Sequence, residues 1–428
     1  MNARSLSPLA AGALCLVFAP AASAHPVTVD GNPGEWSARS PIVENLGLIV
    51  RDAQNAGEFV WRDPAADSRT DIASPENVAD LWAFQVTGNT SGVYFLARRD
   101  PNATFSGDPI QLQIAIDVDR TAGSGQAFFA EYGDASVANA NLWEYLVVTR
   151  FGSGNQPRVY NTSFSDVSAG QAQAAQDKHV EIFVPWSVLG LSGPPAAPLR
   201  FTVATFRSNS QDRAVDISDS PNVLDAVTQY GEPSGTLATP TNTWVEVQDG
   251  IVDHAFDLWF DANGEVRAPL VIQRFVPSGT AAGEWFVIRN VTGAPISLDG
   301  FKLGDEETPD GTGEGMYSFP AGASVAAGAD YIVAYDGAAY QSGLGELPDA
   351  ELSAASSAPD MVKFMPWVGN ATNSLALSNT GDELLIVDPS NTVIDLAAFG
   401  NSPLSELTPF TPVPGTGAIL SRYADSHD

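Results

Sequence analysis

The acidic turn DVDRTAGSG, residues 117–125, is the part of the chain whose residue types point most directly to a metal ion. It follows the alternating run DPIQLQIAI, so Asp117 and Asp119 would project from the same side of an extended strand end, ahead of a flexible loop. Ca²⁺ prefers carboxylate oxygens, and the turn is therefore a candidate structural calcium site. A solvated acidic turn is the alternative interpretation. The candidates for the remaining ligands are Asp71, Asp80 and Glu131.

Aromatic residues and arginines form the second group with binding chemistry. A sugar site needs a flat aromatic side chain, on which the C–H face of a pyranose ring stacks, and planar hydrogen-bonding groups for the hydroxyls. In a β-sandwich a Trp side chain is more often part of the core, which is the competing interpretation. The candidates for a glycan site are Trp61, Trp82, Trp143, Tyr145 and Arg150, with Arg98 and Arg207 as further arginines.

The residue patterns expected of an enzyme are missing from the sequence. The four histidines, at 25, 179, 254 and 427, have no zinc-ligand spacing, and neither a Gly-x-Ser-x-Gly elbow nor a glycine-rich phosphate loop occurs. With 51 acidic residues, carboxylate pairs at the separation that glycosidases use would arise by chance. A free amino-terminal His25 could chelate copper, but enzymes that do so need a second histidine in position. We predict a protein that is not an enzyme.

The first 24 residues predict a signal peptide. Arg4 precedes an apolar run that ends in Ala22-Ser23-Ala24, the small-residue pattern of a cleavage site, so the mature chain would start at His25. The run is too short to span a bilayer, and no later stretch approaches the ~20 apolar residues of a transmembrane helix. The single cysteine, Cys15, lies in this leader, so the mature chain would contain no disulfide. We expect a secreted protein, extracellular or at the cell surface.

The formal net charge of −31, from 51 acidic against 20 basic residues, bears on the partners. Such a field repels phosphate backbones, so nucleic acid is not expected as a partner. An acidic surface also suits a cation-rich extracellular medium, although solubility alone explains it equally well.

Strands are the elements that must position these residues. Residues 110–116 place isoleucine and leucine on one face and two glutamines and an alanine on the other, which is typical of a half-buried strand. The same period recurs along the chain between Gly, Pro, Asn and Asp turns, whereas residues 170–179 predict a loop or a short helix. Many short strands predict an all-β fold with two β-sandwich domains. The turn-rich stretch 261–269 divides a domain at 25–262 from one at 268–424.

The second of these domains resembles a lamin tail domain. The stretches that carry the resemblance are PLVIQRFVPSG, GEWFVIRNVTGAPISLDGFKLGD, YSFPAGASVAAGADYIVAYD and NSLALSNTGDELLIVDPSNTVIDLAAFG. The resemblance implies an immunoglobulin-like sandwich with protein partners, in which Glu284 and Asp305 are turn and surface residues. The ending GTGAILSRYADSHD is similar to the Ser-x-x-Arg-type ending of bacterial relatives, so a C-terminal anchor or sorting signal could lie beyond Asp428.

The first domain resembles the family nine carbohydrate-binding-like sandwiches, which include the glucodextranase and DOMON-related groups. The segments VDGNPGEWS, DLWAFQVTGNTSGVYFLARRD, IQLQIAIDVDRTAGSG, HVEIFVPWSVLGL and FTVATFRSN occur in the family's order. The resemblance implies a glycan-binding-like fold that often holds calcium. Within it, Pro185 should end a strand, and one helical turn should bury Trp186 and Leu189.

These observations predict a secreted, non-catalytic binding or adhesion protein. Its first domain would bind a polysaccharide or cell-surface glycan, and its lamin tail domain would contact protein partners. One alternative is a calcium-stabilised structural surface or matrix protein that binds no sugar. Another is an accessory part of a polysaccharide-degrading system.

Overall fold

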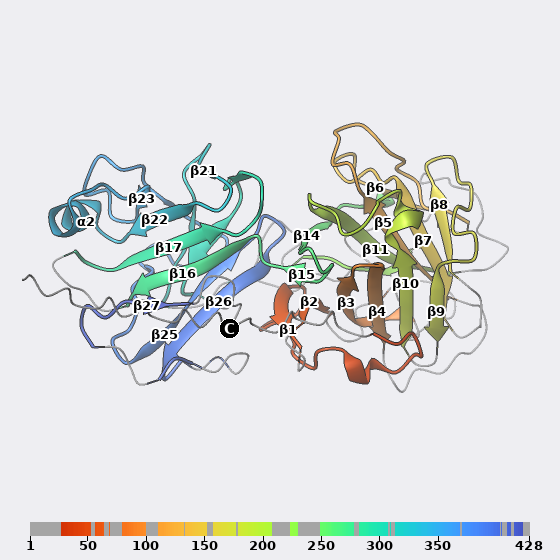
Figure 1. Ribbon diagram of the computed structural model, residues 1–428, viewed down its shortest axis with the longest axis horizontal. Coiled ribbons are helices and arrows are strands. Elements are labelled where there is room, and N and C mark those ends of the chain that lie inside the picture. The colour runs from red at the N-terminus through yellow and green to blue at the C-terminus, as the bar shows by residue number, and fades with distance from the viewer. Residues whose placement is uncertain are drawn as a thin grey trace, which may run out of the picture.

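The chain is all-β, as predicted, and forms two β-sandwiches that lie side by side as two lobes (Figure 1). The described part of the chain contains one α-helix, α2 (Gly337–Leu344). No helix among the described residues is long and apolar enough to cross a membrane. The computed structural model describes residues 27–52, 56–63, 68, 79–99, 110–131, 133–151, 157–176, 179–207, 223–229, 249–277, 282–306, 309, 313–368, 370–402, 404, 409–411 and 415–422. The predicted signal peptide lies outside these residues.

Two sheets face each other in the first lobe. The strands of one, in spatial order, are β2 (Gly57–Arg62), β3 (Leu81–Asn89), β4 (Gly92–Arg99), β10 (Val180–Pro185) and β9 (Gln173–Gln176). The strands of the other are β15 (Val266–Arg267), β14 (Phe256–Phe260), β11 (Leu199–Arg207), β5 (Ile110–Asp117), β7 (Tyr145–Arg150) and β8 (Arg158–Asn161), with β12 (Val223–Ala226) paired to β11. Residues 173–176, expected in a loop or helix, are thus an edge strand.

Aromatic rings from both sheets fill the core between them. The rings of Phe59 and Phe256 stack with centroids 4.5 Å apart, and Phe201 stacks on Phe256 at 5.6 Å. At the end of β10, Pro185 precedes the 3-10 turn η3 (Trp186–Leu189), whose Trp186 and Leu189 are each 1% exposed. The predicted strand end and buried turn are therefore confirmed.

Strand β5 is buried on both faces, so the prediction of a half-buried strand is wrong. Its second face is covered by the segment that follows the acidic turn, where Phe129 and Ala130 join a separate apolar cluster with Ala115. Gln113 is satisfied there, because its side chain accepts a hydrogen bond from the Ala130 amide at 3.0 Å and donates to the Ala130 carbonyl at 2.9 Å. Gln111 and Gln113 are therefore buried under this second layer of chain and do not face solvent.

The second lobe repeats the architecture with its own core. One sheet contains β24 (Val362–Lys363), β20 (Met316–Ser318), β19 (Lys302–Gly304), β25 (Gly381–Val387) and β26 (Thr392–Gly400). The facing sheet contains β23 (Ala350–Glu351), β22 (Asp330–Ala334), β17 (Trp285–Asn290), β16 (Leu270–Val276) and β27 (Leu420–Ser421). The second lobe also contains a short strand pair, β18 (Ile296–Ser297) with β21 (Ser324–Val325). A similar short pair in the first lobe is β6 (Ser136–Val137) with β13 (Ile251–Val252).

The stretch 284–305 builds this second fold. Asn290 organises a turn, because its side-chain oxygen accepts from the Thr292 amide at 2.8 Å while its amide group donates to Ala294. Asp305 was expected at the surface, but it is 1% exposed and accepts hydrogen bonds from the amides of Gly315 and Ala376. Burial raises the pKa of this carboxyl to about 7. Through these two hydrogen bonds the Asp305 carboxyl group links the backbone at Gly315 to the backbone at Ala376, where the buried amides need an acceptor.

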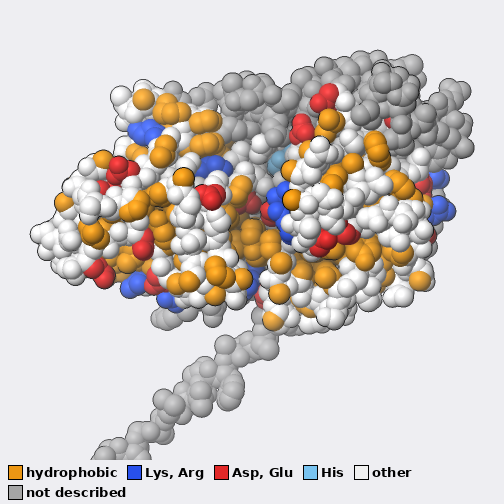
Figure 2. All heavy atoms as spheres, turned by 90° about the horizontal axis from the view of Figure 1, so that it is seen from above, with side chains coloured by type: hydrophobic (Ala, Val, Ile, Leu, Met, Phe, Trp, Pro, Cys, Tyr) orange, Lys and Arg blue, Asp and Glu red, His pale blue; other side chains and the backbone are white. Residues whose placement is uncertain are grey.

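One sheet runs through both lobes. Strand β1 (Gly47–Arg51) pairs with β2 on one side and, in parallel, with β26 of the second lobe on the other, which gives an 11-stranded sheet. Apolar residues from both lobes, among them Leu48, Val60, Trp367 and Val393, form a common cluster at this seam. Figure 2 shows hydrophobic side chains gathered where the lobes meet.

Gly47 allows the seam to close. A Cβ atom at this position would lie 2.5 Å from the Phe59 ring and 2.7 Å from the Thr392 hydroxyl of the other lobe. Gly47→Ala should therefore lower the free energy of unfolding by about 1 to 3 kcal/mol, the usual cost of overpacking, in a chemical denaturation experiment. Gly193→Ala is the matched control, because a Cβ there meets nothing within 4 Å. Equal unfolding midpoints for the two variants would contradict this role.

Candidate functional site

Of the four aromatic candidates, Trp82 is the most exposed, with 37% of the residue accessible to solvent. Trp61 and Trp143 were predicted as glycan platforms, but they are core residues, 1% and 0% exposed. The Trp61 indole donates to the buried Thr228 carbonyl at 3.0 Å. Tyr145 packs against the core of the first lobe, with its hydroxyl close to Gly190. Neither tryptophan offers a free face to a sugar, and Tyr145 is partly buried.

A β-bulge orients Trp82. Leu81 pairs with Arg99 and Ala83 pairs with Arg98, so Trp82 is an extra residue in β3 without a partner in β4. Leu81 is fully buried while the next residue, Trp82, is exposed. Bulges commonly redirect one side chain beside a binding site, and here the bulge turns an indole outward at the end of the strand.

Trp82 borders a pocket of about 450 Å³ on the outer face of β2, β3 and β4. Val60, Arg62, Ala83, Gln85 and Arg98 alternate along the strands with the core residues Trp61, Phe84 and Ala97, so these five lining residues face away from the core. The segment before β1 crosses this sheet face, held by the Trp36 indole, which donates to Glu181 at 2.7 Å, and it closes one side of the pocket. The lining residues are Arg39, Ser40, Val60, Arg62, Trp82, Ala83, Gln85, Arg98, Arg99 and His179.

A buried carboxylate lies beside this pocket. Glu58 is 1% exposed, accepts from the Ser37 amide at 3.0 Å and also accepts from the Gln85 amide group. Burial lowers the pKa of Arg98, and the negative charge of Glu58 opposes that shift. The pocket thus combines an exposed aromatic ring with several fixed hydrogen-bond donors.

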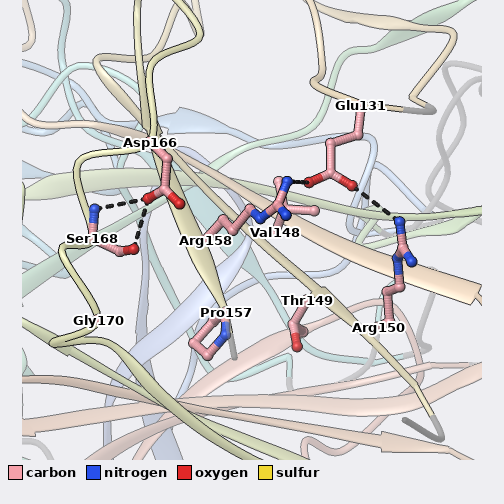
Figure 3. Close-up of a pocket in the computed structure, with 9 residues that line it drawn as sticks. All are labelled: Glu131, Val148, Thr149, Arg150, Pro157, Arg158, Asp166, Ser168 and Gly170. Atoms are coloured by element: carbon pink, nitrogen blue, oxygen red, sulfur yellow. Dashed lines mark hydrogen bonds and ion pairs between the residues drawn. The ribbon is translucent and has the colours of Figure 1, made fainter. Parts of the chain in front are cut away.

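Arg150 belongs to a second pocket, of about 530 Å³, on the opposite sheet (Figure 3). Arg150 and Arg158 approach Glu131 from the adjacent strands β7 and β8, at 3.4 and 3.3 Å. The same carboxylate also accepts from the Tyr160 hydroxyl at 2.7 Å, and Tyr160 is only 8% exposed. Because β3 and β7 lie in different sheets, the predicted glycan residues Trp82 and Arg150 do not share one site.

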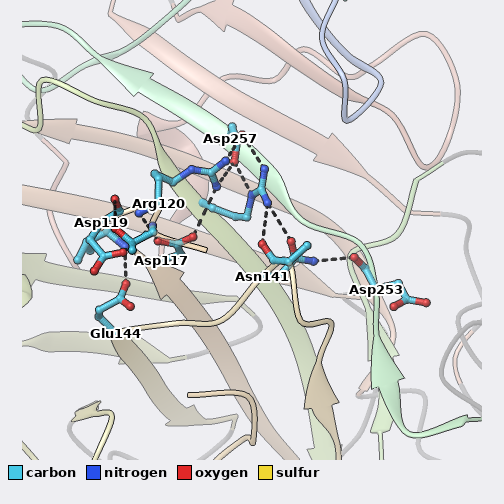
Figure 4. A network of polar contacts seen from close by, with 11 residues as sticks. Asp117, Asp119, Arg120, Asn141, Glu144, Asp253 and Asp257 are labelled. Atoms are coloured by element: carbon cyan, nitrogen blue, oxygen red, sulfur yellow. Dashed lines mark hydrogen bonds and ion pairs between the residues drawn. The ribbon is translucent and has the colours of Figure 1, made fainter. Parts of the chain in front are cut away.

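Asp117 and Asp119 lie close to Glu144 at the end of β5 (Figure 4). One carboxylate oxygen from each of the three residues lies within 4.8 Å of the others. The Asp117 and Asp119 carboxylates accept from the amides of Arg120 and Thr121, each at 2.7 Å, and Glu144 Oε2 accepts from the Val118 amide at 2.9 Å. The buried Glu144 Oε1 has no hydrogen-bond partner among the described residues.

The third acid differs from the predicted ones. Asp80 lies close to the buried Asp63 and Asp225, in a separate cluster of carboxylates. Glu131 lines the second pocket, and Asp71 lies outside the described residues. Glu144 meets Asp117 because the Glu144 amide donates to Ile116 at 3.1 Å where β7 begins its pairing with β5. Burial raises the pKa of Glu144, and the charges of Asp119 and Asp117 add to that shift.

An arginine pair stabilises the other side of this turn. The guanidinium groups of Arg120 and Arg200 both contact Asp257, at 2.9 and 2.8 Å, and Arg200 also reaches Asn141 at 3.1 Å (Figure 4). Arg120 adopts a left-handed backbone with φ of 54°, which turns its side chain back across the strand end. The arrangement fixes the loop that carries Asp119.

Comparison with known proteins identifies the second lobe. Residues 264–401 match the family model of the Lamin Tail Domain, which confirms the predicted family and an immunoglobulin-like sandwich there. A solved structure, a DUF4876 family protein from Bacteroides thetaiotaomicron, is 13% identical with a TM-score of 0.24, over 59% of this chain and 72% of that one. At that TM-score the likeness supports no functional argument. No curated protein matches the chain.

His254, beside the Arg200 network, gives a pH-dependent test of the fold. Burial, with a smaller contribution from Arg200, lowers its pKa to about 3. The unfolded chain takes up a proton below about pH 6.5, whereas the folded chain does not, so stability falls as the pH drops through this range. Relative to His254→Gln, the wild type should lose about 2 kcal/mol between pH 7 and pH 5 in denaturant titrations. Parallel pH profiles for the two proteins would refute the buried neutral imidazole.

Proposed function

We propose that this is a secreted binding protein without catalytic activity, whose first lobe binds a glycan in the Trp82 pocket. The observation that carries the proposal is the exposed indole at the bulge, next to a pocket lined by hydrogen-bonding side chains. Pyranose rings stack on such a face, while guanidinium and amide groups bind hydroxyls. Most of the lining residues lie on the paired strands β2, β3 and β4, which would hold that part of the site in place before a ligand arrives.

Binding without bond cleavage is supported by the residues around the indole. Glycosidic hydrolysis uses two carboxyl groups on either side of the scissile bond. Among the described residues that line the Trp82 pocket there is no Asp or Glu. Glu58, a buried acid beside the pocket, accepts hydrogen bonds from the Ser37 amide and the Gln85 amide group. The groups present suit recognition of a sugar.

The second lobe supplies the other half of the proposed activity. Lamin tail domains are protein-interaction modules, so this lobe would contact a protein at the cell surface or in the matrix. Export would follow from the leader at residues 1–24. Because β1 and β26 share a sheet, a glycan bound to the first lobe and a protein bound to the second would be held at a fixed separation.

We further propose that Ca²⁺ stiffens the first lobe at Asp117, Asp119 and Glu144. The donor set fits, because Ca²⁺ takes carboxylate oxygens and Glu144 Oε1 is buried without a hydrogen-bond partner among the described residues. The backbone amides that hold the three carboxylates would keep the oxygens in place. Additional ligands would come from loop carbonyls and water.

The glycan proposal is tested with an array probed by the full mature chain and by Trp82→Ala. Loss of the stacking surface should weaken binding at least tenfold, about 1.4 kcal/mol. Phe128→Ala is the control, because Phe128 is also 40% exposed but does not line the pocket. A blank array for the wild type, or equal binding by Trp82→Ala, would rule the site out.

The calcium proposal is tested by thermal melting with Ca²⁺ and with a chelator. An ion that binds only the folded chain at a hundred times its Kd adds about 2.7 kcal/mol, so the wild type should melt several degrees higher with Ca²⁺. Asp119→Asn should abolish the difference. Asp299→Asn should keep it, because Asp299 is likewise held by a backbone amide, that of Gly322, but lies in the other lobe. A wild-type melting curve unaffected by the chelator would exclude the ion.

A further inference from the structure

The charge of the Trp82 pocket is opposite to that of the protein. The chain has 51 acidic and 20 basic residues, yet the pocket is lined by four arginines and His179, with no carboxylate among its described lining residues. A pocket for neutral sugars needs no such concentration of cationic groups. The basic lining of this pocket is better suited to an anion than to a neutral sugar.

The four arginines play different parts. Arg99 is 3% exposed and its guanidinium lies 5.2 Å from the Phe151 ring, so it belongs to the core side of the strand. Arg62 forms an exposed ion pair with Glu44 at 3.2 Å. Neither Arg39 nor Arg98 forms an ion pair among the described residues. These two guanidinium groups are available to a ligand.

Arg98 is the half-buried one of this pair, on β4 opposite Ala83. The charge of the buried Glu58 acts on Arg98, but Glu58 already accepts hydrogen bonds from the Ser37 amide and the Gln85 amide group, so it balances the Arg98 charge only in part. Removing a guanidinium from water without a hydrogen-bonded counter-charge is costly. Gln85 is itself fully buried at the pocket, and its Oε1 has no hydrogen-bond partner among the described residues. The Arg98 guanidinium and the Gln85 side-chain oxygen can therefore both form further hydrogen bonds, to a ligand.

We propose that the Trp82 pocket selects glycans that contain uronic acids, with the pyranose ring on Trp82 and the carboxylate bound by Arg98 and Arg39. This inference rests on the proposed glycan binding and names its ligand class. A carboxylate is planar, so its two oxygens can accept the two parallel N–H groups of one guanidinium in a single plane. Because the rest of the surface is acidic, short oligosaccharides should bind better than long polyanions.

The test is calorimetric titration of the full mature chain with hexasaccharides of galacturonate, glucuronate and mannuronate. Each is paired with its carboxyl-reduced neutral counterpart, and a sulfated galactose hexamer provides the second anion. All titrations are done with a chelator, because a divalent cation between two carboxylates would imitate binding. At least one uronate hexamer should bind ten times or more tighter than its reduced counterpart and than the sulfated hexamer.

Three variants assign the effect to the pocket. Arg98→Gln should remove the preference for the acid while the neutral sugar binds as before, and Arg39→Gln, at an exposed position, should reduce the preference without risk to folding. Arg158→Gln, in the other pocket, should change nothing. Equal binding of acid and reduced sugars, or tighter binding of the sulfated hexamer, overturns this inference but leaves glycan binding intact. Failure of every sugar to bind overturns both.

Discussion

The backbone pairing of β1 with β26 is the contact on which the arrangement of this molecule depends. An unpaired edge strand exposes amide and carbonyl groups that need partners, and here the edges of two sandwiches satisfy each other. The seam is sealed by a shared apolar cluster and by Asn391, whose amide reaches Gln229 of the other lobe at 3.4 Å. The two lobes therefore share one sheet while each keeps its own core, and the strands that carry the Trp82 pocket continue directly from that seam.

Many contacts in the interior of both lobes follow from the need of buried polar groups for hydrogen-bond partners. The glutamines of β5 face a second layer of chain, Asp305 links two backbone segments, and Lys302 donates to the Asp388 carbonyl at 2.7 Å deep in the second lobe. Each of these side chains would be expensive to bury without its partner. Several acidic side chains are buried and accept hydrogen bonds from backbone amides, as Asp305, Asp395 and Asp225 do. The net charge of the chain therefore overstates how many acidic groups lie on the surface.

The face that contains the Trp82 pocket is shaped by a local irregularity in a regular sheet. Strand alternation directs Trp61 and Phe84 to the core and Val60 and Gln85 outward. The bulge adds Trp82 to the outer face, and the segment before β1 closes the pocket around it. Arginines from two strands and a loop then meet at one place. A pocket with an exposed indole and a basic lining thus forms on a chain whose formal net charge is −31.

The sequence determined the strands, the turn at Pro185 and the lamin tail family, because these depend on local periodicity and on turn residues that act within a few positions. It also placed Asp117 and Asp119 on one turn. Only the tertiary structure decided that Glu144 joins them, that Trp61 and Trp143 are buried while Trp82 is exposed, and that β1 completes the sheet of the other lobe. Burial and proximity between distant segments depend on strand register and sheet pairing, and alternation within one strand contains no information about either.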